Sequence, residues 1–169
     1  MLSLFSGFFQ ACNSQNKHLD VGDPAPSFTL QDQHDSLFRS SDFVGKKILV
    51  IYFYPKDESL VCTKEACSFR DYNEEFLKAG ALIIGINSGS VESHRKFQEN
   101  HQLPFLLLSD PDDRVYRMFG VRRKFFIPGR ETFVVDKSGK IVFRYSSMTN
   151  GPKHEQEALD FVKKMGLQQ

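Results

Sequence analysis

The sequence predicts an α/β fold in which helices pack against a mixed sheet of parallel and antiparallel strands. Two apolar runs, residues 48–54 and 81–87, have the composition of strands that are buried on both faces. A helical pattern separates them, so the three segments form a strand–helix–strand unit with parallel strands. Residues 131–136 and 140–145 flank Lys137-Ser-Gly139 and predict an antiparallel hairpin near the end of the chain.

A small hairpin is expected before the first buried strand. Two prolines, a glycine and an aspartate in residues 21–26 mark a turn or an extended entry. Residues 27–31 alternate as a strand does, and residues 37–39 form the return arm after a polar turn. Ser41 or Asp42 can then cap a short helical turn.

One helix is expected between the two buried strands, from about Cys62 to Lys78. Its large apolar side chains fall at helical spacing, and Gly80 ends it. The residues at this spacing are Phe69, Tyr72, Phe76 and Leu77.

The second half of the chain supplies further helices and one more strand. Ser90 can cap a helix that reaches about His101, and residues 104–109 form a third short strand. After an aspartate-rich turn, residues 115–119 form a short helix, and residues 153–165 form the closing helix.

The composition indicates an ordinary globular domain. The chain has 169 residues, of which 40% are hydrophobic and 25% charged, enough for one domain with one good core. A net charge of +1 gives no argument for binding to nucleic acid or to acidic membranes. No nucleotide, flavin or haem motif is present, so no cofactor is expected.

The first 20 residues are expected to form an N-terminal arm, followed by the domain from residue 21 to 169. The arm begins with an apolar stretch too short to span a bilayer, and it lacks the basic start of a signal peptide. Gln10-Ala-Cys12 resembles the end of a bacterial lipoprotein signal, although imperfectly. The favoured interpretation is an arm with Cys12 as a bystander in a cytoplasmic protein. The alternative is an envelope-anchored protein.

Cys62 and Cys67 are the leading candidates for chemistry. Cys62 lies where a strand ends and a helix begins, and the free N–H groups and partial positive charge of a helix N-terminus favour thiolate over thiol. Five residues along a helix rotate a side chain by about 140° net and separate the Cα atoms by roughly 8–9 Å, beyond the limit of roughly 7 Å for a disulfide. A disulfide between them therefore requires the helix to unwind, which favours a switchable redox pair.

A metal site is the less favoured interpretation of the cysteines. The Cys-x4-Cys spacing is looser than that of zinc knuckles, and no second pair exists. His94 and His101 lack a usual ligand spacing, and each is expected at the surface or at a helix end.

Three further residues can act with Cys62. Pro55 ends the buried strand and shapes the loop. Ser59 can place a hydroxyl beside the sulfur, and it can equally be the N-cap of the helix. Arg130 lies at the entry to a strand, where its guanidinium can favour the thiolate and hold oxygen atoms, although a surface arginine fits the same position.

The chain resembles the peroxiredoxins of the AhpC/TSA family, specifically the peroxiredoxin Q or bacterioferritin-comigratory-protein group. The resemblance covers roughly residues 21–166. It is carried by ordered motifs, namely Val21-Gly-Asp-Pro-Ala-Pro26, Pro55-Lys-Asp-Glu-Ser59-Leu-Val-Cys62-Thr-Lys-Glu-Ala-Cys67-Ser-Phe-Arg-Asp71, Leu108-Ser-Asp-Pro-Asp112, Gly120-Val121 and Arg130-Glu-Thr-Phe-Val-Val-Asp136.

The resemblance implies a thioredoxin fold with an N-terminal hairpin extension and the reduction of hydrogen peroxide or organic hydroperoxides. Cys62 would be the peroxidatic cysteine, and Cys67 the resolving cysteine that forms an intramolecular disulfide. Ser59 and Arg130 would activate the thiolate, and Pro55 completes the motif. Thioredoxin or a glutaredoxin-like protein would be the reductant, and the group is monomeric or weakly dimeric.

Some features leave other functions open. Leu60-Val61 replaces the Pro-Gly that is usual in this group, which can change the stiffness of the loop and the unwinding of the helix. Residues 125–128 could be core, a contact surface or the rim of a substrate pocket, and core is the favoured interpretation. The alternatives to a peroxidase are a protein thiol–disulfide oxidoreductase and a non-catalytic binding module of the same fold.

Overall fold

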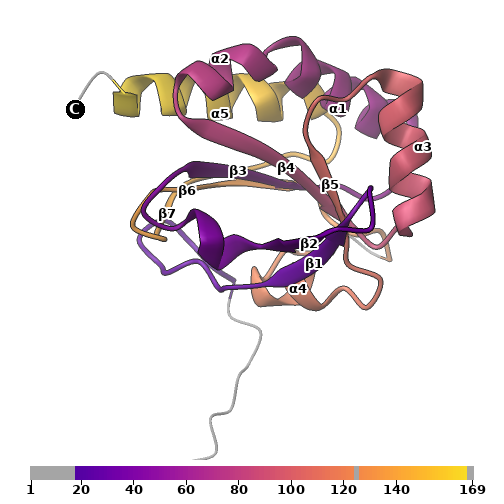
Figure 1. Cartoon of the computed structure of the whole chain (residues 1–169), viewed down its shortest axis with the longest axis horizontal. Helices are drawn as coiled ribbons and strands as arrows, with labels where there is room; N and C mark the ends of the chain where they lie inside the picture. Colours follow the sequence, from indigo (N-terminus) through magenta and orange to yellow (C-terminus); the bar gives the residue numbers. More distant parts are fainter. Residues whose placement is uncertain (1–17, 124–125, 167–169) are drawn as a thin grey trace, which may run out of the picture.

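A mixed sheet of seven strands, in the order β2-β1-β5-β4-β3-β6-β7, forms the centre of the molecule (Figure 1). The structure, a computed structural model, describes residues 18–123 and 126–166. The strands are β1 (Thr29–Asp32), β2 (Leu37–Arg39), β3 (Ile48–Phe53), β4 (Ala81–Asn87), β5 (Leu106–Ser109), β6 (Glu131–Val135) and β7 (Ile141–Ser146).

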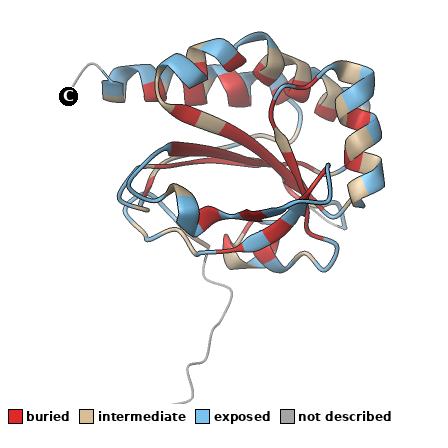
Figure 2. Ribbon diagram, in the orientation of Figure 1, coloured by how far each residue is buried: buried red, intermediate tan, exposed pale blue. Residues whose placement is uncertain are grey.

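The strand directions confirm the pattern that the sequence predicts. The central strands β3, β4 and β5 run parallel, while β6 pairs antiparallel with β3 and forms a hairpin with β7. The first hairpin, β1 and β2, extends the sheet at the edge away from β7, through an antiparallel pairing of β1 with β5. Every residue of β3 is buried, as expected of a strand covered on both faces (Figure 2).

Helices α1, α2, α3 and α5 pack on one face of the sheet. In Figure 1, α1, α2 and α5 lie above the sheet and α3 stands at its right-hand side. The helices are η1 (Ser40–Phe43, a 3₁₀ turn), α1 (Leu60–Asp71), α2 (Asn73–Lys78), α3 (Val91–His101), α4 (Arg114–Met118) and α5 (Gly151–Gly166). Alternate residues of β3, including Val50 and Tyr52, point into the core under these helices, where the buried Phe69 of α1 also packs.

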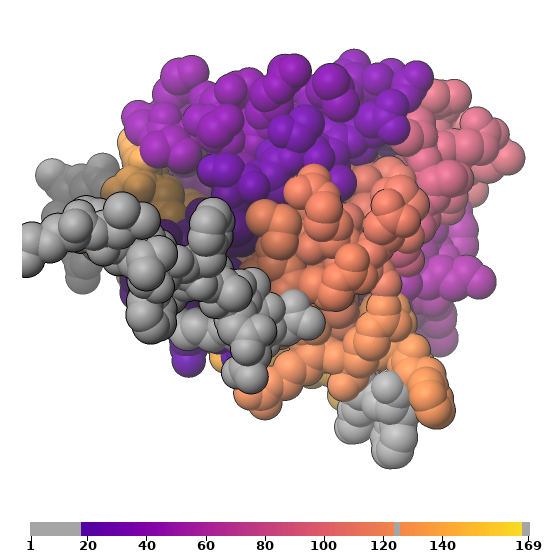
Figure 3. Space-filling view, turned by 90° about the horizontal axis from the view of Figure 1, so that it is seen from below, coloured from indigo at the N-terminus to yellow at the C-terminus, as the bar shows by residue number. Residues whose placement is uncertain are grey.

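The opposite face of the sheet is covered by the β1–β2 hairpin and α4. The other set of β3 side chains, Leu49, Ile51 and Phe53, packs there against Phe28 and Phe119. Seen from this side, the coral to orange atoms of residues around 110–123 lie against the indigo to purple N-terminal hairpin (Figure 3). Both apolar faces of the central strands are therefore removed from water.

The expected single helix from Cys62 to Lys78 is two helices. The backbone leaves the helical conformation at Tyr72, with φ −110° and ψ 11°, and α2 begins at Asn73. Phe69 and Phe76 lie on either side of this break, and both are buried in the core with ring centroids 5.9 Å apart. The prediction that Tyr72 and Leu77 share their apolar face was wrong, since they are 44% and 47% exposed.

Two expectations concern the ends of the chain and an apolar loop. The segment 1–17, with Cys12 and most of the predicted arm, lies outside the described residues, as does Phe125. Near the start of the described residues, the N–H of Leu19 donates to the carbonyl of Phe119 at 3.4 Å. Phe126 and Ile127 are 95% and 55% exposed, so the expectation that residues 125–128 are core was wrong for these two. Within the described ranges, no helix is long and apolar enough to cross a membrane.

Candidate active site

Cys62 is the third residue of α1 and lies in the first turn of that helix. The loop that leaves β3 after Phe53 leads into α1, so the cysteine is placed above the end of the buried strand. Its side chain is 1% exposed and belongs to the core under the helices. The free N–H groups of the first helical turn are therefore close to the sulfur in a site that largely excludes water.

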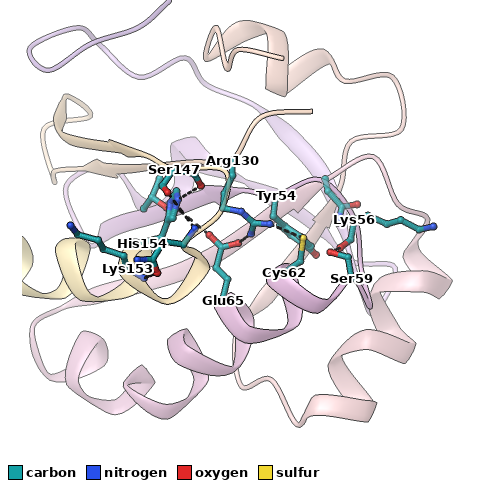
Figure 4. Close-up of polar contacts among 12 residues, drawn as sticks. Tyr54, Lys56, Ser59, Cys62, Glu65, Arg130, Ser147, Lys153 and His154 are labelled. Carbon is teal, nitrogen blue, oxygen red and sulfur yellow. Dashed lines mark hydrogen bonds and ion pairs between the residues drawn. The ribbon is translucent and has the colours of Figure 1, made fainter. Parts of the chain in front are cut away.

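Arg130 reaches Cys62 from the entry to β6. Because β6 pairs antiparallel with β3 and Glu131 lies opposite Phe53, Arg130 comes beside the end of β3 where the Cys62 loop begins. Arg130 Nη2 donates to Cys62 Sγ at 3.1 Å (Figure 4). The guanidinium is 2% exposed, so the contact with the sulfur is made by a buried cation.

The segment before Arg130 is held closely against its neighbours. Gly129 N–H donates to the hydroxyl of Tyr116 at 2.6 Å. A Cβ atom on Gly129 would lie 1.9 Å from the carbonyl oxygen of Arg122, so only glycine fits this approach. The arginine therefore leaves a backbone segment with a defined position.

Glu65 is a site residue that the sequence argument missed. It is 0% exposed, and its Oε2 pairs with Arg130 Nη1, so one guanidinium holds both Glu65 and Cys62. Burial raises the pKa of Glu65 to about 8, against the lowering influence of Arg130. The available signal was its spacing, because Glu65 is three residues after Cys62 and so projects from the same side of α1.

His154 of α5 lies behind Glu65, on the side away from the sulfur (Figure 4). Its Nδ1 contacts Thr132 Oγ1 at 2.9 Å and lies 3.7 Å from Glu65 Oε1, and its Nε2 lies 2.9 Å from the carbonyl oxygen of Ser147. Burial, assisted by the charge of Arg130, lowers the pKa of His154 to about 4 although the hydrogen bond to Ser147 opposes it. The imidazole is therefore neutral at neutral pH.

Cys67 is half-buried, and α1 is continuous from Leu60 to Asp71. Both cysteines are free thiols in this conformation. The continuous helix keeps their Cα atoms roughly 8–9 Å apart, which is too far for a disulfide. Arg70, one turn further along, donates from Nη1 to the carbonyl of His101 at 2.9 Å.

Ser59 and Pro55 belong to the loop that connects β3 to α1. Ser59 occupies the N-cap position, but its side chain makes no capping hydrogen bond, and its hydroxyl donates to the carbonyl of Lys56 at 3.3 Å. Pro55 is half-buried directly after Tyr54. In this conformation the Ser59 hydroxyl is thus bonded within its own loop.

The buried carboxylate of Asp57 holds the same loop in place. Asp57 accepts hydrogen bonds from Tyr54 Oη at 2.7 Å, Asn87 Nδ2 at 2.8 Å and Ser93 Oγ at 2.5 Å, and it contacts His94 Nδ1 at 2.8 Å. Burial alone would raise the pKa of Asp57, but these hydrogen bonds outweigh it and lower the pKa to about 2. The loop is thereby tied to β4 and α3.

This contact corrects the expectation for His94. It lies in the first turn of α3, but it is 0% exposed and pairs with Asp57, so it is not a surface residue. His101 is at the end of α3, where its Nε2 lies 2.9 Å from Glu58 Oε2. Among the described residues, no group of three or more His, Cys, Asp or Glu side chains is placed to hold a metal ion.

Comparison with known proteins identifies the family. The chain matches the AhpC/TSA family over residues 21–144. The chain belongs to this family. It is 44% identical to the chloroplastic peroxiredoxin Q of Sedum lineare over 155 residues, which covers 90% of this chain and 83% of the relative.

Solved structures agree with this assignment. A peroxidoxin named BcpB from Mycobacterium tuberculosis superposes with a TM-score of 0.82 at 34% identity, covering 88% of this chain and 99% of that one. The bacterioferritin comigratory protein of Xanthomonas campestris, described for its alkyl peroxide reduction activity, gives a TM-score of 0.77 at 30% identity and covers 82% and 92%.

The family and the fold confirm two central predictions. The fold is thioredoxin-like, with the predicted mixed sheet and N-terminal hairpin. The protein is a thiol peroxidase of the peroxiredoxin Q type that reduces hydroperoxides. The spacing of Cys62 and Cys67 is consistent with an intramolecular disulfide.

Proposed function

We propose that Cys62 is the peroxidatic cysteine and that Arg130 holds its sulfur for attack. The observation that carries this assignment is the 3.1 Å contact between Arg130 Nη2 and Cys62 Sγ in the first turn of α1. The thiolate attacks the terminal oxygen of the hydroperoxide, an S–O bond forms, and the O–O bond breaks. The leaving oxygen takes a proton to give water or an alcohol, and Cys62 becomes a sulfenic acid.

Arg130 and the loop then act on the oxygens of the peroxide. The guanidinium can donate to the oxygen that gains negative charge as the O–O bond breaks. Ser59 supplies a further donor once its hydroxyl turns from the carbonyl of Lys56. Pro55 keeps the loop rigid at the end of β3.

Cys67 is proposed to resolve the sulfenic acid. Its thiolate attacks Cys62 sulfur, the S–S bond forms, and the sulfenic oxygen leaves as water. The first two turns of α1 must unwind because the intact helix keeps the two Cα atoms too far apart. A dithiol reductant of the thioredoxin or glutaredoxin class then reduces the disulfide and is itself oxidised.

The remaining proposals concern the domain boundary, the oligomeric state and the location of the protein. We propose a domain from residue 21 to 169 that acts as a monomer or a weak dimer. A cytoplasmic location stays a prediction, with envelope anchoring through Cys12 as the alternative.

The roles of the two cysteines are tested by peroxide consumption with a thioredoxin and its reductase. Cys62→Ser should abolish consumption, because it removes the attacking sulfur. Cys67→Ser should reduce about one equivalent of peroxide and then stop, because the sulfenic acid is not resolved. Peroxide consumption by Cys62→Ser at the wild-type rate would refute the assignment of Cys62, and sustained turnover by Cys67→Ser would refute that of Cys67.

A further inference from the structure

The loop that joins α4 to β6 carries apolar side chains that the rest of the protein leaves in water. Phe126 is 95% exposed and Ile127 is 55% exposed. Among the large hydrophobic side chains of residues 18–123 and 126–166, that of Phe126 is the most exposed. A single exposed apolar residue is common on protein surfaces, so the meaning of these two depends on how the loop is held and on what surrounds it.

The base of this loop is fixed to the core. The N–H of Gly129 donates to the hydroxyl of Tyr116 at 2.6 Å, and Gly129 passes so close to the carbonyl of Arg122 that it has no room for a Cβ atom. Tyr116 is 6% exposed, and its ring packs edge-on against Phe53 with centroids 6.0 Å apart. The chain therefore leaves and returns at one anchored point, and the orange atoms that follow residue 120 project from the lower right of Figure 3.

The surroundings of the loop are basic. Among the described residues from 114 to 127, four are arginines and none is acidic, and every one of the four is exposed. They are Arg114, Arg117, Arg122 and Arg123. The whole chain has a net charge of +1, so it would be −3 without these four residues. The near-neutral total therefore conceals a local excess of positive charge.

Contacts between the loop and α4 keep the arginines and the apolar tip together. Arg123 pairs with Asp113, the residue directly before α4. The Arg123 guanidinium also lies 5.5 Å from the ring centroid of Tyr116 within α4. One acidic residue thus balances one arginine, and the remaining positive charge lies beside Phe126 and Ile127.

We propose that the surface formed by Arg122, Arg123, Phe126 and Ile127 docks the protein on an anionic lipid surface. The two apolar side chains enter the boundary between headgroups and acyl chains, and the arginines lie at the level of the anionic headgroups. This interaction goes beyond the peroxidase reaction. Because Arg130 directly follows the base of the loop, docking keeps the active-site arginine close to the lipid.

The size of the apolar tip favours a lipid surface over a protein partner. A stable protein interface buries about 800 Å² on each partner, whereas one aromatic side chain supplies only about 150–250 Å². Phe126 and Ile127 together therefore fall short of such an interface. Binding at a lipid surface requires only a few inserted apolar side chains and basic residues around them.

The test is flotation of the full chain with vesicles of phosphatidylcholine, with and without phosphatidylserine. The wild-type protein should float with the anionic vesicles and not with the neutral ones, and about 1 M salt should release it. Phe126→Ser should lower the partition coefficient about tenfold, because the inserted ring is lost. Arg122→Gln should lower it about fivefold, as expected for one basic residue at an anionic surface.

Matched controls remove the same kinds of side chain from the helical layer on the opposite face of the sheet. Leu77 of α2 is 47% exposed and Lys164 of α5 is exposed, so Leu77→Ser and Lys164→Gln should leave flotation unchanged. Phe126→Ser should keep the wild-type melting temperature, because its side chain is in water. The residues before Cys12 are present in every variant, so any difference between variants comes from the substitution itself.

Three results would overturn the proposal. The first is no flotation of the wild-type protein with anionic vesicles, and the second is equal flotation with neutral ones. The third is wild-type flotation of Phe126→Ser. If the wild-type chain does not float but sediments as a dimer that Phe126→Ser converts to a monomer, the surface binds a second copy of the chain instead.

Discussion

Replacing Gly151 by alanine should loosen the helix that carries both cysteines. Gly151 is the first residue of α5 and lies directly against α1. A Cβ atom there would lie 2.7 Å from the carbonyl oxygen of Val61, 2.9 Å from Cβ of Glu65 and 3.3 Å from its N–H nitrogen. The added methyl group therefore clashes with the Val61 carbonyl and lies close to the Glu65 N–H, which belong to the helical turn between the two cysteines. A side chain could rotate to relieve such a clash, but helix backbone can move only if the turn is distorted.

The magnitude follows from this geometry. Inserting a methyl group into a packed contact costs about 1–3 kcal/mol, and unwinding the first turns of α1 relieves the clash. The equilibrium between packed and unwound α1 should shift toward unwinding by about 5- to 150-fold. If unwinding limits disulfide formation, the rate of Cys62–Cys67 bond formation rises by up to this factor, whereas the first reaction with peroxide changes little.

The assay is a single turnover with one equivalent of peroxide, quenched with an alkylating reagent and analysed by mass spectrometry. The chain contains no tryptophan, so this readout is preferable to intrinsic fluorescence. Gly166→Ala is the matched control, because it lies in the same helix and its Cβ would meet nothing within 4 Å. A lower melting temperature with an unchanged rate of disulfide formation would refute the link between Gly151 packing and unwinding.

Three further changes test the charges around the site. Arg130→Lys should lower the rate of Cys62 oxidation about 100-fold or more in single-turnover experiments, because one ammonium cannot replace the guanidinium fork; a wild-type rate would contradict this. Asp57→Asn should lower the free energy of unfolding at pH 7 by about 2–3 kcal/mol. The pKa of Asp57 is lower in the folded state, so the ionised carboxylate stabilises the protein above about pH 3.9, and this stabilisation is lost as pH falls toward 2. Urea unfolding of both proteins at pH 7 and pH 3 checks this prediction. Burial raises the pKa of Glu155 to about 7, so the free energy of unfolding should decline as pH rises from about 4.5 to 7. Glu155→Gln should remove that decline. The same pH dependence of unfolding in the wild-type protein and the variant would contradict this prediction.

The local pattern predicted much of the fold. The apolar runs predicted β3 and β4, and the turn residues Lys137-Ser-Gly139 predicted the β6–β7 hairpin. Both predictions succeed because the signals for a buried strand and for a tight turn are contained in a few consecutive residues. The break at Tyr72 was missed since the spacing of Phe69 and Phe76 fits one continuous helix as well as two, and only packing on the sheet distinguishes them. The exposure of Phe126 was missed for a similar reason, as an aromatic residue is buried only where another element covers it.

The sequence by itself determined the family and predicted the redox pair. Cys62 follows a buried strand at the start of a helix, Cys67 is too far along that helix to bond while it is intact, and the ordered motifs indicated the peroxiredoxin family. Only the tertiary structure decided what surrounds the sulfur. Arg130 contacts Cys62 across 68 residues because β6 pairs antiparallel with β3, and Glu65 and His154 join them because α5 packs against α1. These contacts depend on which distant segments of the chain pack together, and the spacing of residues within one segment does not show this.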